Sequence, residues 1–120
     1  MEYEISVKRA YEAASESDGT RILVDRLWPR GLSHDKAKLD EWDKAIAPSP
    51  ELRKAYHASG DYEKFKEAYV KELDANEKTG EFLSKARDFL QKGPLTLVFG
   101  SKDPSHSNAQ VLKEYLEEHL

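Results

Sequence analysis

The stretch Leu95-Thr96-Leu97-Val98-Phe99 decides the fold, because it is a continuous apolar run built from residues that favour β-strands. Such a run is typical of a strand covered on both faces, as in the parallel sheets of α/β proteins. Ile22-Leu23-Val24 has the same character, and the alternating Ile5-Ser6-Val7 is a third candidate strand. The sequence therefore predicts a mostly parallel sheet of about three strands.

Apolar residues recur at helical spacing through much of the remaining chain. Apolar stripes cover residues 62–73 and 82–90, and the second stripe ends at the Gly-Pro pair 93–94, a combination that stops a helix. The Ser-Pro pair 49–50 has the pattern of a helix start, and a last helix begins near residue 107. With the strands, these segments predict a small three-layer α/β sandwich in which about five helices flank the sheet.

The connections between the strands differ greatly in length. Residues 10–20 form about the shortest link that can join two parallel strands, so the orientation of the first strand relative to the second stays open. Residues 31–93 are long enough for a right-handed crossover. We expect residues 1–120 to form a single domain, because no repeat or linker interrupts the chain.

Composition excludes several kinds of protein. The 120 residues carry a net charge of −4, no apolar run long enough for a membrane helix, and no signal-peptide pattern at the start. We therefore expect a cytoplasmic protein without a membrane partner, and the acidic balance argues against a nucleic-acid partner. The absence of cysteine excludes disulfides, thiolate metal sites and a cysteine nucleophile.

The sequence indicates no cofactor and no metal. Its four histidines lack the spacing of a metal site, and it contains no phosphate-binding loop, dinucleotide-binding motif or α/β-hydrolase motif. Whether the protein is an enzyme, and of which reaction, is therefore left open.

Charged residues follow each of the three predicted strands. Arg9 ends the first, Asp25-Arg26 follow the second, and Lys102-Asp103 follow the third. Parallel strands bring their carboxyl ends to one edge, where open α/β sheets bind ligands. The planar guanidinium group suits phosphate and carboxylate. We therefore predict that a small anionic molecule bearing one of these groups binds through Arg9, Arg26, Trp28, Arg30 and Lys102.

The motif Arg26-Leu27-Trp28-Pro29-Arg30-Gly31 allows other interpretations. The Trp28 ring either fills the edge of the core or forms a wall on which a planar ligand stacks. The alternative function is a protein-interaction or regulatory module, in which the same motif docks an acidic segment of a partner. A narrow pocket favours the small molecule, and a flat basic face favours the protein partner. The oligomeric state is not decided by the sequence.

Three residues are candidates for proton transfer: Asp25 and Asp103 follow strands, and His106 is the histidine nearest to the end of the third strand. Guanidinium groups near Asp25 are expected to favour its charged form and so to lower its pKa. Asp25 then either anchors these arginines or balances a positive pocket. In a purely structural alternative, both aspartates pair with the arginines and the lysine and pin the loops.

The block Asp18-Gly19-Thr20-Arg21-Ile22-Leu23-Val24-Asp25-Arg26-Leu27-Trp28-Pro29-Arg30-Gly31 resembles the YeaO-like family, within a larger group of small bacterial proteins of unknown function. Further matching residues span nearly the whole chain, from Lys8-Arg9-Ala10-Tyr11 to Lys102-Asp103 and His106. The resemblance implies a compact α/β domain with charged residues at the strand ends. It implies no established activity and no assigned catalytic residues.

Overall fold

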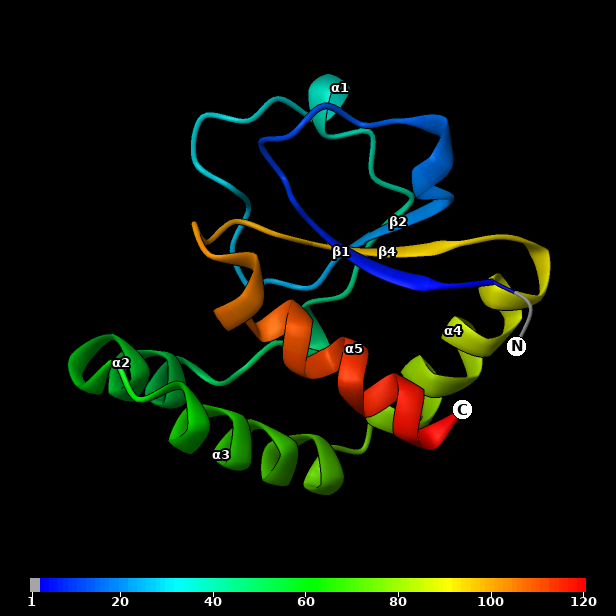
Figure 1. The fold of residues 1–120 in the computed structure, drawn as a ribbon. Coiled ribbons are helices and arrows are strands. Elements are labelled where there is room, and N and C mark those ends of the chain that lie inside the picture. Colours follow the sequence, from blue (N-terminus) through cyan, green and yellow to red (C-terminus); the bar gives the residue numbers. More distant parts are fainter. Residues whose placement is uncertain (1–2) are drawn as a thin grey trace.

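The computed structural model describes residues 3–120, which contain a four-stranded sheet (Figure 1). The strands are β1 (Ile5–Arg9), β2 (Thr20–Leu23), β3 (Glu41–Trp42) and β4 (Leu95–Phe99). They lie in the order β1-β4-β2-β3, and every neighbouring pair is parallel. The predicted parallel sheet is confirmed, and the first strand runs parallel to the second.

The sequence did not predict β3, so the expected count of about three strands is corrected to four within residues 3–120. The two residues of β3 carry no apolar run. The backbone around them bonds to β2: the N–H of Asp40 donates to the carbonyl of Arg21 at 2.9 Å, and the N–H of Asp43 donates to the carbonyl of Leu23 at 2.8 Å. This strand therefore arises from pairing with β2 and not from its own sequence.

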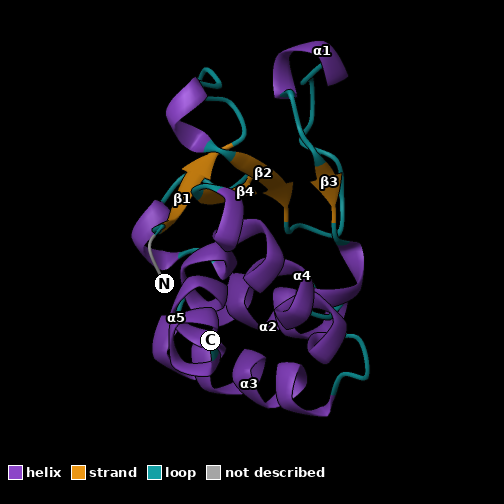
Figure 2. Ribbon diagram, turned by 90° about the vertical axis from the view of Figure 1, so that its right-hand side faces the viewer, coloured by secondary structure: helices purple, strands orange, loops and turns teal. Residues whose placement is uncertain are grey.

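Four long helices lie on one side of the sheet (Figure 1, Figure 2). They are α2 (Pro50–Ser59), α3 (Tyr62–Ala75), α4 (Thr79–Lys92) and α5 (Asn108–His119). The other side is covered by the loops after β1 and β2, which contain a 3-10 helix (Glu16–Asp18) and the single-turn helix α1 (His34–Ala37). The predicted α/β sandwich is confirmed, and loops make up most of its second outer layer.

A hydrophobic cluster lies against each face of the sheet. Ile22, Val24 and Leu97 belong to the larger cluster under the long helices, and Leu23 and Val98 belong to the smaller cluster under the loops. Successive strand residues point to opposite faces, so a strand with apolar neighbours on both sides is apolar without interruption. This arrangement explains why β2 and β4 read as continuous apolar runs in the sequence.

Serine caps begin α2 and α5. The Ser49 hydroxyl accepts the N–H of Leu52 at 3.1 Å, and Pro50 occupies the first turn of α2. The Ser107 hydroxyl accepts the N–H of Gln110 at 3.1 Å at the start of α5. Both helix starts were predicted from the sequence and are confirmed.

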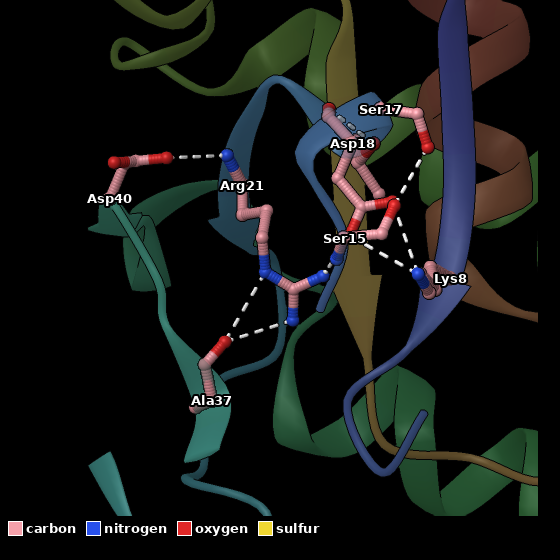
Figure 3. A network of polar contacts seen from close by, with 8 residues as sticks. Lys8, Ser15, Ser17, Asp18, Arg21, Ala37 and Asp40 are labelled. Atoms are coloured by element: carbon pink, nitrogen blue, oxygen red, sulfur yellow. Dashed lines mark hydrogen bonds and ion pairs between the residues drawn. The ribbon is translucent and has the colours of Figure 1, made fainter. Parts of the chain in front are cut away.

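A polar network closes the amino end of β2 (Figure 3). The Asp18 carboxylate accepts hydrogen bonds from Arg21 Nη1 at 2.7 Å, from Lys8 Nζ at 3.1 Å and from the N–H of Ser15 at 3.0 Å. Arg21 also donates to the carbonyl of Ala37 through Nε and Nη2, at 3.2 and 2.9 Å. These five residues, called the Asp18 network below, attach the loop layer to the sheet.

Gly19 connects the Asp18 network to β2 with a φ of 65°, in the left-handed region. A Cβ at this position would stand 2.1 Å from the carbonyl oxygen of Pro94. The N–H of Thr20 donates to the same oxygen at 3.0 Å, so the backbone must approach β4 closely here. Only glycine satisfies both the backbone angle and the close approach.

Candidate functional site

The parallel order brings the carboxyl ends of β1, β4 and β2 side by side. Neighbouring strands lie about 4.8 Å apart, so the ends of these three strands follow one another within roughly 10 Å. Arg9 Nε, at the end of β1, donates to the carbonyl of Ser101 at 2.8 Å, just after β4. Asp25 and Arg26 follow β2. The structure therefore gathers residues that the sequence predicted for one site.

Asp25 is bonded to the neighbouring strand end and to α5. Its Oδ2 accepts the N–H of Gly100 at 2.8 Å, and its Oδ1 accepts the side-chain amide of Asn108 at 3.1 Å. Asn108 donates to the carbonyl of Val24 as well, at 3.1 Å. A Cβ at Gly100 would lie 3.3 Å from Asp25 Oδ2, which is a tight approach. Asp25 thus connects β2, β4 and α5 through neutral partners.

Burial raises the pKa of Asp25; the hydrogen bonds from Gly100 and Asn108 and the charge of Arg53 oppose this effect without reversing it. The expected lowering of this pKa is wrong. No guanidinium group of residues 3–120 comes within the 4.0 Å of an ion pair with Asp25. Removal from water therefore determines the direction of the shift.

The cations at this edge make few contacts with the protein. Arg26 Nη2 forms two long hydrogen bonds, to the carbonyls of Ala47 at 3.3 Å and Pro48 at 3.4 Å. Arg30 and Lys102 are exposed. Within residues 3–120, no carboxylate lies within 4.0 Å of five cationic side chains, namely Arg9, Arg26, Arg30, Arg53 and Lys102.

These unpaired cations exclude the loop-pinning arrangement in which Asp25 and Asp103 bind the arginines and the lysine. Asp25 bonds to neutral groups, and Asp103 bonds to a serine and a histidine. The positive charge of this edge is therefore not compensated by direct contact with the aspartates that the sequence placed beside it.

Arg53 is a candidate that the sequence analysis missed. It lies one turn into α2, where its N–H donates to the carbonyl of Ser49 at 3.0 Å, and its charge acts on Asp25. The serine cap could have located this turn of the helix in the sequence. Only the tertiary fold brings that turn close enough for the Arg53 charge to act on Asp25.

Trp28 packs on the loop-covered face of the sheet. Its Nε1 donates to the carbonyl of Leu32 at 2.7 Å, and its ring stacks on His34 with 4.0 Å between ring centroids. The ring also meets Trp42 edge-on at 5.4 Å, and it packs against the smaller hydrophobic cluster. The structure thus places Trp28 in the second layer, with His34 on its face.

Asp103 and His106 form an exposed pair at the 3-10 helix Pro104–His106, with Asp103 Oδ2 2.8 Å from His106 Nδ1. Asp103 Oδ1 accepts the N–H and the hydroxyl of Ser105, at 3.0 and 2.7 Å. The hydrogen bonds from Ser105 and then from His106 lower the pKa of Asp103. An aspartate at Nδ1 favours the tautomer protonated there, which leaves Nε2 as the proton acceptor.

No three His, Asp or Glu side chains of residues 3–120 are grouped so that they could hold a metal ion. In the same part of the chain, no helix has the length and apolar character needed to cross a membrane.

A pocket of about 290 Å³ opens beside the start of β1, at the opposite end of the strands from Asp25.

The chain matches a family model described as the inactive DUF488-N3 subclade over residues 4–120. It is 49% identical over 113 residues to the uncharacterized protein YeaO of Escherichia coli (strain K12), which covers 93% of this chain and 96% of that protein. It is 34% identical over 116 residues to uncharacterized proteins of Mycobacterium bovis and Mycobacterium tuberculosis, covering 96% of this chain and 95% of each relative. No solved structure matches the chain.

Proposed function

From the premise that the chain belongs to the YeaO-like family, within the inactive DUF488-N3 subclade, we propose that it binds a small anionic molecule at the carboxyl ends of β1, β2 and β4. The anion bears phosphate or carboxylate. Arg26 and Arg53 hold it beside Asp25, and three further cations flank this position: Arg9, Arg30 and Lys102.

The observation that carries the proposal is the group of cations without ion pairs at this edge of the sheet. Arg26 uses one guanidinium nitrogen, Nη2, in long hydrogen bonds to carbonyls. Its other nitrogens have no hydrogen-bond partner within residues 3–120, so they are available to a ligand. Guanidinium groups bind phosphate and carboxylate through two parallel hydrogen bonds. An anion would supply negative charge in direct contact with these guanidinium groups, which no carboxylate within residues 3–120 supplies at ion-pair distance.

Binding without turnover agrees with the description of the subclade as inactive. The Asp25 carboxylate is hydrogen-bonded to Gly100 and Asn108, and the Asp103 carboxylate is hydrogen-bonded to Ser105 and His106. Both carboxylates are thus engaged with groups of the protein. Their engagement supports a role in shaping the site, so turnover is not part of the proposal.

The test compares thermal unfolding in phosphate, sulfate and small carboxylates with unfolding in chloride at matched ionic strength. A ligand at about 100 times its dissociation constant stabilises a protein by roughly 2.7 kcal/mol, which a melting curve resolves easily. We expect one class of anion to raise the melting temperature well above the value in chloride. Equal melting temperatures across the panel would contradict the proposal.

Variants connect the response to the named residues. Arg26→Lys and Arg53→Lys keep the charge but lose the planar fork, so we expect the anion response to fall while the fold persists. Arg87→Lys is the matched control, since Arg87 is exposed on α4. A response that is unchanged in the first two variants would show that charge alone, without planar recognition, attracts the anion.

Docking of an acidic protein segment is the second candidate, and exposed apolar side chains favour it. Leu27 is 63% exposed between Arg26 and Arg30, and Tyr11, 44% exposed, donates its hydroxyl to the Arg30 carbonyl at 2.8 Å. An acidic peptide with an apolar residue could contact both the arginines and these side chains. Leu27→Ser should weaken the binding of such a peptide but leave the response to phosphate or sulfate unchanged.

A further inference from the structure

β1 lies at one edge of the sheet, with β3 at the opposite edge (Figure 2). Its bonds to β4 come from alternate residues: the carbonyl of Glu4 accepts the N–H of Leu95 at 3.1 Å, and the N–H of Ala10 donates to the carbonyl of Phe99 at 2.7 Å. Even-numbered residues of β1 therefore bond to β4, and the N–H and C=O groups of Ile5 and Val7 point outward.

We propose that this outer edge pairs antiparallel with β1 of a second copy of the chain, about a two-fold axis through Ser6. In that register Ile5 lies opposite Val7 of the second copy, and Val7 lies opposite Ile5. Each of these two pairs exchanges two backbone hydrogen bonds, so the outward groups of both residues are satisfied. The two sheets then form one continuous sheet of eight strands.

Charge complementarity identifies a second copy as the occupant. Glu4 stands before the strand and Lys8 near its end, and the proposed register places Glu4 of each copy opposite Lys8 of the other. Glu4 is exposed. Lys8 contacts Asp18 at 3.1 Å, keeps 20% of its side chain exposed, and has further ammonium hydrogens to donate. Parallel pairing of two copies would instead align like charges.

An exposed apolar side chain and a pocket lie at the start of β1. Tyr3, which precedes β1, is one of the three large apolar side chains that residues 3–120 expose, with 39% of its surface exposed. The pocket of about 290 Å³ opens beside the start of this strand and is lined by Tyr3, Glu4, Ile5, Lys113 and Glu117. A second copy paired along β1 would cover Tyr3 and this pocket, which an isolated edge leaves in contact with water.

A single cysteine tests the register directly, because the chain has none of its own. Ser6 is exposed, and the proposed axis places it opposite itself in a non-hydrogen-bonded pair with about 4.5 Å between the Cα atoms, which suits a disulfide. We expect Ser6→Cys, oxidised with diamide, to form a disulfide-linked dimer at least about tenfold faster than Ser84→Cys, on the exposed face of α4. Non-reducing electrophoresis measures both rates.

Mass measurement by sedimentation over a wide range of protein concentration provides the second readout. We expect the unmodified chain to dimerise, and Glu4→Lys to raise the dimer dissociation constant about tenfold by placing two lysines opposite each other. Glu63→Lys makes the same charge change at an exposed position of α3, and it should leave the dimer dissociation constant unaltered. A monomer at every concentration, with Ser6→Cys no faster than Ser84→Cys, would overturn the proposal. None of these substitutions touches Arg26 or Arg53, so the anion response is tested independently.

Discussion

An aspartate lies near each end of β2, and the two carboxylates have different kinds of partners. Before the strand, the Asp18 carboxylate contacts Arg21 at 2.7 Å and Lys8 at 3.1 Å. After the strand, the Asp25 carboxylate contacts the N–H of Gly100 and the amide of Asn108, both neutral. Burial raises the pKa in both places, but at Asp18 the hydrogen bonds from Ser15, Lys8 and Arg21 together outweigh it and lower the pKa.

This difference separates a structural network from a candidate site. At the amino end the buried guanidinium of Arg21 is neutralised by Asp18 and bonded to the carbonyl of Ala37, so its donors are used within the fold. At the carboxyl end Arg26 and Arg53 have no carboxylate within ion-pair distance in the described chain. Only the second arrangement leaves positive charge for a ligand.

The largest expected effect is that of Asp18→Asn. This change leaves the Arg21 guanidinium, with 4% of its side chain exposed, without a carboxylate. Breaking a buried ion pair in this way costs about 3 kcal/mol or more, so we expect a loss of that size in the free energy of unfolding at neutral pH. Urea unfolding measures it, and Asp88→Asn, at an exposed position of α4, is the control.

The stability that Asp18 contributes should change with pH in a defined direction. Because the folded pKa of Asp18 is lowered, its contribution to stability is present above the unfolded pKa of about 3.9 and is lost as the pH falls through the folded value. We expect the unmodified chain to lose this part of its stability in acid, and Asp18→Asn to lack it. Parallel acid curves for the two proteins would show that the network contributes no charge interaction.

Asp25→Asn should have a much smaller effect on stability. Asparagine can still accept the N–H of Gly100, and the substitution removes a partly buried charge that has no cationic contact, so we expect a change within about 1 kcal/mol. Loss of the nearby negative charge should also tighten phosphate binding. Calorimetry beside an unfolding curve tests both, and a loss of about 3 kcal/mol with weaker anion binding would instead favour an anchoring role.

The direction of the Asp25 pKa adds a second contrast with Asp18. A raised folded pKa means that the folded state prefers the protonated form, so the contribution of this group to stability falls as the pH rises from the unfolded through the folded pKa. Asp25→Asn should therefore gain stability relative to the unmodified chain as the pH rises through that window. A relative loss over the same window would contradict the burial argument.

The smallest effect is expected for Asp103→Asn, because Asp103 and His106 are both exposed. We expect no measurable change in the melting temperature, since exposed pairs of this kind contribute little. The substitution should alter the tautomer of His106, because the carboxylate 2.8 Å from Nδ1 is removed. Nitrogen NMR of the imidazole ring detects that change, and an unaltered tautomer would show that Asp103 does not orient the ring.

Much of the fold could be predicted because its signals are local. The apolar runs of β2 and β4, the serine caps of α2 and α5, and the Gly-Pro stop after α4 are patterns of adjacent residues. β3 and α1 could not be found in this way. β3 is held by backbone bonds to β2, and α1 is a single turn within a loop whose packing depends on the other face of the sheet.

The candidate site was predicted only in part. Parallel order correctly brought Arg9 and Asp25 to one edge, but the sequence did not show what each side chain contacts. Arg53 was missed because it comes from a helix, and the Asp25 pKa was misjudged because charge was assigned by proximity in sequence. Asp25 and Arg26 are neighbours in the chain, yet the carboxylate turns to Gly100 and Asn108.

The sequence by itself determined the class of fold, the limits of its main elements, the edge that carries the charged residues, and the family resemblance, because periodicity, capping and motif identity are local properties. Tertiary structure alone decided which charges are neutralised. The two bonds to Asp25 come from residues 75 and 83 positions away, and Asp18, in a 3-10 helix, is paired with Lys8 of β1, 10 positions earlier. Burial and contact distance set the energy of a charge, and both are defined only once distant parts of the chain have packed.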